Sequence, residues 1–153
     1  MSYEARIAEL SLELPPAPAP GGTYNPVVEV NGIAYVSGHG PVLPDGSMIT
    51  GTVGADLSEE QGVQAARQVG LAILATLKAQ LGSLDRIARI VKVLGMVNAA
   101  PDFGRHPTVI NGFSDLMVEI FGENGRAARS AVGMGSLPGN IAVEIEAILE
   151  LKE

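Results

Sequence analysis

Alternation of apolar and polar residues predicts a β-hairpin near the start of the chain. Two β-branched runs, 27–30 and 33–37, flank Asn31-Gly32. This dipeptide tolerates the two positive φ angles of a type I′ turn. The second run leads into Ser37-Gly38-His39-Gly40-Pro41, where two glycines and a proline direct the backbone out of the sheet. Such a backbone can offer its own N–H and C=O groups to a ligand.

Two later segments carry apolar residues at helical spacing. The first begins with a capping box at 58–61 and ends before Gly82, and the second covers 107–121. Their apolar positions are Ala66, Val69, Ile73, Leu77 and Leu81, and then Ile110, Phe113, Met117 and Phe121. Gly62 and Gly70 lower the helix propensity of the first segment, so we expect them to allow close packing on a sheet.

Three further strands complete the pattern. Residues 87–97 have the composition of a buried strand, and 127–134 and 141–151 read as two strands joined by a turn. The predicted order is ββαβαββ, with a minor strand near 47–51. Two helices on one face of a mixed sheet make a two-layer α+β domain. We expect self-association to cover the second face, which carries many apolar residues.

The N-terminal segment reads differently from the rest. Residues 3–10 predict a short helix, and the proline-rich run at 15–22 forces an extended connection. We therefore interpret 1–22 as an arm with a Pro-rich connection, and 23–153 as the domain proper.

Charge and composition exclude several kinds of site. The chain has no cysteine, which rules out disulfides, thiolate nucleophiles and Cys-based zinc sites. Its net charge of -7 and its 4% aromatic content argue against nucleic acid as a partner. No segment has the length and apolarity of a membrane span, and we expect a cytoplasmic protein without a metal or other cofactor. The two histidines, His39 and His106, belong to no spaced metal motif.

Arg129 is a candidate for binding a carboxylate. The strand period of two places it on one face with Ala131 and Gly133, whose small size leaves room for a guanidinium. Arginine binds carboxylates through two parallel hydrogen bonds. A solvated or structurally paired arginine fits the sequence equally well.

Carboxylates alternate with apolar residues along the last strand. Glu144, Glu146 and Glu150 point away from the apolar face. They read as solvated carboxylates, although Glu144 could instead orient a water molecule in a subunit cleft. His39, on the glycine-rich turn, is a further candidate for ligand contact, with a surface position as the alternative.

Several motifs, in order from Tyr24 to the C-terminus, resemble the YjgF/RidA family, whose members are also named L-PSP endoribonucleases. They are Tyr24 with its following strand, Tyr35-Val36-Ser37-Gly38, Val109-Ile110-Asn111, Ala128-Arg129-Ser130, and Leu137-Pro138 leading into Val143-Glu144-Ile145-Glu146-Ala147. The resemblance implies a chorismate-mutase-like α+β fold, a homotrimer and clefts between its subunits.

The same resemblance implies a chemistry and a set of residues. Members hydrolyse enamine and imine intermediates such as 2-iminobutanoate to the 2-keto acid and ammonia, without a cofactor. By position, Arg129 corresponds to the arginine that holds the substrate carboxylate, and Glu144 to the glutamate that positions water. The other positions that line the family's cleft correspond to Tyr24, Ser37, Gly38 and Asn111.

The chain departs from the family pattern at three places. His39 stands where deaminating members have Gln, Ala131 stands where many have Cys, and Arg126-Ala127 replaces Phe-Pro. We expect His39 and Ala131 to line the cleft, and Arg126 to admit a more acidic ligand. The N-terminal arm and the long first helix, within residues 54–87, resemble a divergent subgroup of the family.

Three functions follow for this site. The first is cofactor-independent deamination of small imines or enamines by Arg129 and Glu144. The second is a non-catalytic trimer that binds a small carboxylate-bearing molecule or has a regulatory role. The third, RNA cleavage, is supported by the family's older name, but the acidity of the chain and the lack of an acid/base histidine pair argue against it.

Overall fold

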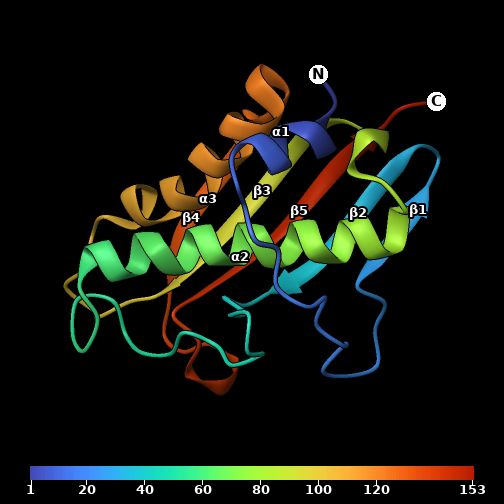
Figure 1. Ribbon diagram of the computed structural model, residues 1–153. Helices are drawn as coiled ribbons and strands as arrows, with labels where there is room; N and C mark the ends of the chain where they lie inside the picture. Colours follow the sequence, from blue (N-terminus) through green and yellow to red (C-terminus); the bar gives the residue numbers. More distant parts are fainter.

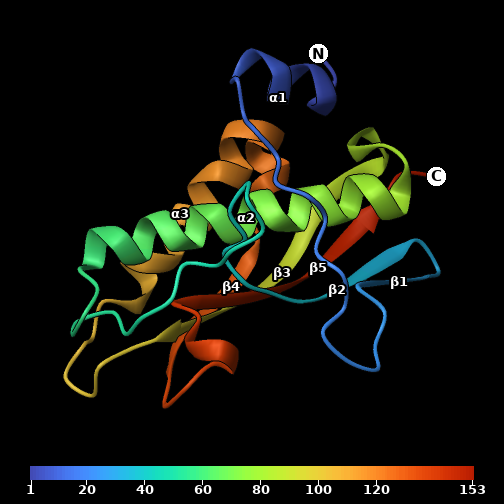
Figure 2. The ribbon, with the colours of Figure 1, turned by 60° about the horizontal axis from the view of Figure 1, so that its bottom comes forward.

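One five-stranded sheet and two long helices form the body of the protein, which we describe from a computed structural model covering residues 1–153 (Figure 1). The helices are α1 (Tyr3–Glu9), α2 (Glu59–Leu81) and α3 (His106–Phe121), and the strands are β1 (Val27–Val30), β2 (Ile33–His39), β3 (Ile87–Asn98), β4 (Ala128–Met134) and β5 (Val143–Leu151). Short 3₁₀ turns lie at Leu84–Arg86, Gly122–Gly125 and Pro138–Asn140. After α1 the order is ββαβαββ, and α2 and α3 cover one face of the sheet (Figure 2), so the predicted α+β fold is confirmed.

The sheet is mixed, in the order β1-β2-β5-β3-β4. Only β3 and β4 run parallel; the other neighbours are antiparallel. The β1–β2 hairpin turns at Asn31 and Gly32, with φ of 51° and 76°, as predicted. The minor strand expected near 47–51 does not form, because this segment makes only isolated bridges, Val42 to Met48 and Thr50 to Ile141.

Both long helices end where the sequence predicts. The Ser58 hydroxyl accepts from the backbone N–H of Gln61, and the Ser58 N–H donates to the Gln61 side chain, which completes the capping box. Gly82 ends α2 with a φ of 83°. None of the helices has both the length and the apolar character needed to cross a membrane.

The expectation that Gly62 and Gly70 pack on the sheet is wrong. A Cβ on Gly70 would meet Leu116 of α3, and one on Gly62 would meet Val53 and Val109. These glycines therefore allow α2 to approach α3 and the loop that precedes α2. The sequence periodicity identified the buried face of α2 but not the element that covers each position.

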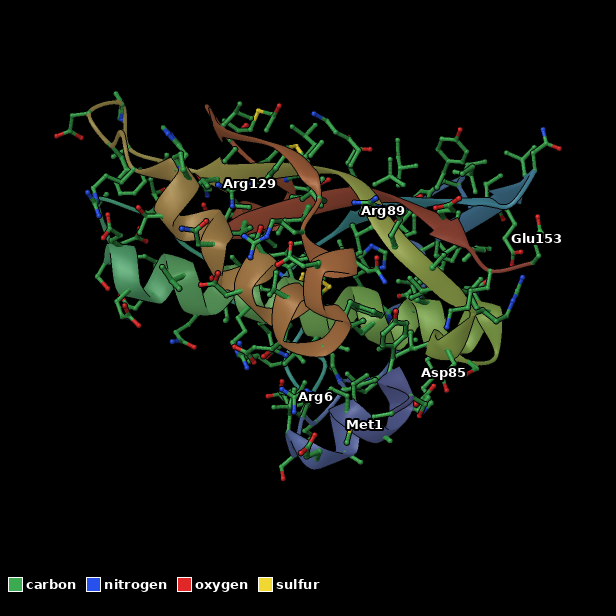
Figure 3. The ribbon with its side chains drawn as sticks, turned by 90° about the horizontal axis from the view of Figure 1, so that it is seen from above. Met1, Arg6, Asp85, Arg89, Arg129 and Glu153 are labelled. Atoms are coloured by element: carbon green, nitrogen blue, oxygen red, sulfur yellow. The ribbon has the colours of Figure 1, made fainter.

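The helix α1 lies on the outer side of the α2–α3 layer (Figure 3). The Tyr3 ring packs edge-on against Phe121 with 4.6 Å between ring centroids, and the Tyr3 backbone N–H donates to Asp85 Oδ1 at 2.7 Å. Ile7 is buried against the helices. From α1 the chain crosses α2 and descends to β1 (Figures 1 and 2). The N-terminal segment is thus packed on the rest of the chain.

The two faces of the sheet differ in what covers them. On β5, Val143, Ile145, Ala147, Leu149 and Leu151 are buried under the helices, whereas Glu144, Glu146, Ile148 and Glu150 occupy the opposite face. This opposite face, which we call the open face, also exposes apolar side chains: Tyr35 is 46% exposed and Val132 is 38% exposed. The alternation read from the sequence is confirmed.

Candidate functional site

A cavity of about 850 Å³ opens where the N-terminal arm meets the end of β2. It is lined by residues 18–21 of the arm, by 37–40 of β2 and the turn after it, and by Glu144 and Glu146 of β5. Five of the residues singled out from the sequence therefore line one cavity, namely Tyr24, Ser37, Gly38, His39 and Glu144. The arm residues and Glu146 were not anticipated as cavity residues, because no sequence motif places the arm beside β2.

A β-bulge shapes the floor of this cavity. Val36 pairs with Ala147, but the next pair is His39 with Ile145, so β2 contains one more residue than β5 over this stretch. Bulges of this kind redirect side chains next to functional sites. Here a Cβ on Gly38 would collide with Oε2 of Glu144, so the glycine leaves the space that the carboxylate occupies.

Glu144 is half-buried, and its carboxylate makes no hydrogen bond or ion pair within the chain. Burial raises the pKa of its carboxyl above 4.5, and the nearby charge of Glu146 adds to the shift. A carboxylate with a raised pKa is a stronger base than an ordinary glutamate, which suits it to accept a proton from water.

The His39 ring faces the core rather than the cavity. Nδ1 lies 2.6 Å from the Ser37 carbonyl oxygen, and Nε2 lies 2.8 Å from the Thr76 hydroxyl on α2. Because a carbonyl only accepts, Nδ1 carries the proton and Nε2 accepts from Thr76. Burial lowers the pKa of His39, opposed in part by the hydrogen bond to Ser37. A ligand contact by His39 would therefore have to use its backbone or its ring carbons.

Arg129, Asn111 and Ala131 lie outside the cavity. The cross-strand neighbour of Arg129 is Val93, which is buried under the helices, so Arg129 is on the helix-covered face, between β4 and α3 (Figure 3). Its Nη1 donates to Asn111 Oδ1 at 2.8 Å and to Ser114 Oγ at 3.1 Å. Its Nε and Nη2 groups have no partner in the chain, so one edge of the guanidinium remains able to bind a carboxylate.

The strand face around Arg129 is less open than its small residues suggest. A Cβ on Gly133 would collide with the His106 ring, which fills the space there. Arg126 is also outside the cavity lining. It is exposed and pairs with Glu123 at 3.2 Å, and this contact raises the pKa of Arg126. The structure contains no group of three or more His, Cys, Asp or Glu side chains that could hold a metal ion.

Comparison with known proteins identifies relatives that match nearly the whole chain. The family model for YjgF/chorismate mutase-like proteins, described as candidate endoribonucleases, matches residues 4–150. Protein TCP17 of Trypanosoma cruzi is 41% identical over 148 residues, which cover 96% of this chain and 92% of that protein. A 2-iminobutanoate/2-iminopropanoate deaminase of Dermatophagoides farinae is 30% identical over 142 residues, covering 92% of this chain and 95% of that protein.

A solved structure from Shewanella oneidensis, also described as a candidate endoribonuclease, superposes with a TM-score of 0.94 at 34% identity, covering 99% of this chain and 100% of the other. The family model, the relatives and this structure each cover nearly the whole chain. The chain belongs to the YjgF/RidA family.

Proposed function

We propose that the protein is a cofactor-independent deaminase that hydrolyses small 2-imino acids to 2-keto acids and ammonia, at a site shared between neighbouring copies of a homotrimer. The relative from Dermatophagoides farinae, named a 2-iminobutanoate/2-iminopropanoate deaminase, supports the reaction class. The location of the acidic residues and of Arg129 in different parts of the chain supports the shared site.

The observation that carries the proposal is that the cavity contains carboxylates but no cation. Glu144 and Glu146 line it, while no lysine or arginine does, and the His39 ring is turned toward the core by its contacts with Ser37 and Thr76. A substrate carboxylate would be repelled there unless a cation is supplied from elsewhere. Arg129 has a free guanidinium edge, but it lies on the other face of the same sheet. A second copy can supply it.

The open face gives a physical reason for copies to associate. Its apolar side chains include Tyr35 and Val132, and in a single chain a large fraction of each is exposed to water. Covering contiguous apolar surface with a symmetric partner stabilises the assembly by removing that surface from water. The trimer that the family resemblance implies would cover the open face of each copy. Arg129 lies on β4, the edge strand of the sheet, so it is at the border where a neighbouring copy could meet it.

In the proposed reaction, Arg129 of one copy holds the substrate carboxylate through its Nε and Nη2 groups. Glu144 of the neighbouring copy accepts a proton from a water molecule, whose oxygen attacks the C=N carbon. That proton passes to the imine nitrogen, which gives a carbinolamine with one hydroxyl and one amino group. The hydroxyl proton then moves to the amino nitrogen as the C–N bond breaks, so that the carbonyl forms and ammonia leaves. Water is thus the only co-reactant, and catalysis consists of positioning together with proton transfer.

The test is to replace Arg129 by Ala and by Lys. Both variants should weaken 2-ketobutanoate binding, measured by calorimetry, by about 2–4 kcal/mol, or 30- to 1000-fold, because an ammonium cannot form two parallel hydrogen bonds with a carboxylate. Hydrolysis of 2-iminobutanoate should fall in parallel. Arg126→Ala is the matched control, since Arg126 is exposed and paired with Glu123.

Light scattering must show that each variant keeps the assembly of the wild type. Unchanged binding and turnover in a folded Arg129→Ala protein would place the site elsewhere. Binding of 2-ketobutanoate by the wild type without hydrolysis of any imine would support the non-catalytic carboxylate-binding alternative. RNA cleavage that is lost in a Glu144 variant would support the nuclease alternative.

A further inference from the structure

We propose that residues 18–21 of the N-terminal arm form a pocket for the side chain of the substrate, called the side-chain pocket below. This pocket selects 2-imino acids with a long, unbranched apolar side chain over four-carbon ones. This inference rests on the proposed function, because it places the reacting C=N group beside Glu144. Its basis is that the arm forms one wall of the cavity that contains Glu144.

The arm is held at both ends. At its start, the Tyr3 N–H donates to Asp85, and the Leu84 N–H donates to Glu4 Oε1 at 3.0 Å. At its end, the Gly21 N–H donates to the Tyr24 hydroxyl at 2.9 Å, and the Ser37 hydroxyl of β2 donates to the carbonyl oxygen of Asn25, the residue after Tyr24, at 2.6 Å. Tyr24 itself lines the cavity. The arm is therefore fastened to the domain on both sides of the cavity wall.

Between these anchors the chain is stiff. Prolines stand at positions 15, 16, 18 and 20. Each proline fixes φ near -65° and restricts the residue before it, so such a segment is extended and loses little entropy when it contacts a ligand. A stiff wall selects ligands by size and shape, which a mobile tail does not.

Apolar side chains form part of the cavity lining. They are Pro18 and Pro20 of the arm together with Met48 and Ile141. Met48 is 41% exposed, and its flexible thioether can adapt to an apolar ligand. Glu144 and Glu146 are the only acidic residues in the cavity lining, which contains no lysine or arginine.

The size of the cavity points the same way. Its volume of about 850 Å³ lies in the range of sites that enclose drug-sized ligands. A four-carbon imino acid has only a terminal ethyl group to place against this wall. Longer straight chains would bury additional methylene groups there, and each buried methylene improves binding about fourfold, equivalent to 0.8 kcal/mol.

The test uses 2-imino acids generated in situ by an amino-acid oxidase from 2-aminobutyrate, norvaline and norleucine. We expect kcat/KM to rise with chain length, so that the six-carbon substrate exceeds the four-carbon one by about 15-fold. Ala19→Phe, which places a ring on the cavity wall, should lower this ratio to near or below one. Ala17→Phe is the matched control, because Ala17 lies on the same arm but faces the groove beside α2 rather than the cavity. It should preserve the ratio.

Failure of this inference is separable from failure of the proposed function. Turnover of the four-carbon imine without any rise for longer chains, or an unchanged ratio in Ala19→Phe, would overturn the side-chain pocket and leave the deaminase proposal standing. Absence of turnover for every substrate would overturn the deaminase proposal. In that case calorimetry with 2-ketobutanoate and 2-ketohexanoate still decides, since equal affinities for the two acids would overturn the pocket.

Discussion

Arg129 and Glu144 lie on opposite faces of the same sheet. Glu144 pairs across strands with Met96 on the open face, whereas Arg129 pairs with Val93 under the helices, and β3 separates β4 from β5. One chain therefore cannot place both groups on a single small substrate. The proposed function therefore requires that the cavity of one copy and the Arg129 guanidinium of another copy form each site together.

Gly38→Ala should reduce activity more than stability. The added Cβ collides with Oε2 of Glu144, the far end of a flexible side chain that can swing away. Misplacing a catalytic group by about 1 Å can cost 100-fold in rate. We therefore expect kcat to fall by that order with little change in the midpoint of urea unfolding. Gly104→Ala is the control, because a Cβ there meets no atom within 4 Å. Full activity of Gly38→Ala would exclude Glu144 from the reaction.

Glu146→Gln should move the acidic limb of the activity profile to lower pH. If Glu144 must be ionised to accept a proton from water, activity falls as the pH drops through its pKa, which lies above 4.5. Removing the Glu146 charge lowers that pKa, but burial, the larger cause, keeps it raised. Glu150→Gln, on the same strand face but outside the cavity, should have less effect. Equal profiles for Glu146→Gln and the wild type would refute this coupling.

His39 should make stability depend on pH below neutrality. Its pKa is lowered from 6.5 in the folded protein, so the unfolded state binds a proton first as the pH falls. The free energy of unfolding should thus decrease from about pH 7 downward until the folded pKa is reached. His39→Gln keeps a polar group near Thr76 but does not titrate, so its loss over this window should be smaller. Equal losses in urea titrations of both proteins would show that His39 is not the cause.

Local signals in the sequence were sufficient to predict the helices and strands of the domain and their order along the chain. The Asn31-Gly32 turn, the capping box at Ser58 and the alternation along β5 each determine backbone structure within a few residues, and each is confirmed. Long-range packing was not accessible in this way. Gly62 and Gly70 carry no information on whether a sheet or a helix lies against them, and that prediction was wrong.

The candidate site shows the same division. Resemblance at the level of motifs identified residues that line the cavity, such as Tyr24 and Gly38, but alternation alone did not reveal that Arg129 and Glu144 face apart. The core-facing ring of His39 depends on Thr76, which is 37 residues away in the sequence. The contribution of the arm depends on where α1 docks, which no local motif encodes.

Mixed trimers of two inactive variants test the shared site most directly. Arg129→Ala and Glu144→Gln chains, coexpressed with different tags, can be purified as assemblies that contain both. If Arg129 of one copy and Glu144 of its neighbour form each site, every mixed ring of three holds one intact site, and we predict about one third of wild-type turnover of 2-iminobutanoate. If both residues act within one chain, no mixed trimer holds an intact site and turnover is not recovered. Mixed trimers no more active than the separate variants would therefore contradict a site shared between Arg129 of one copy and Glu144 of another.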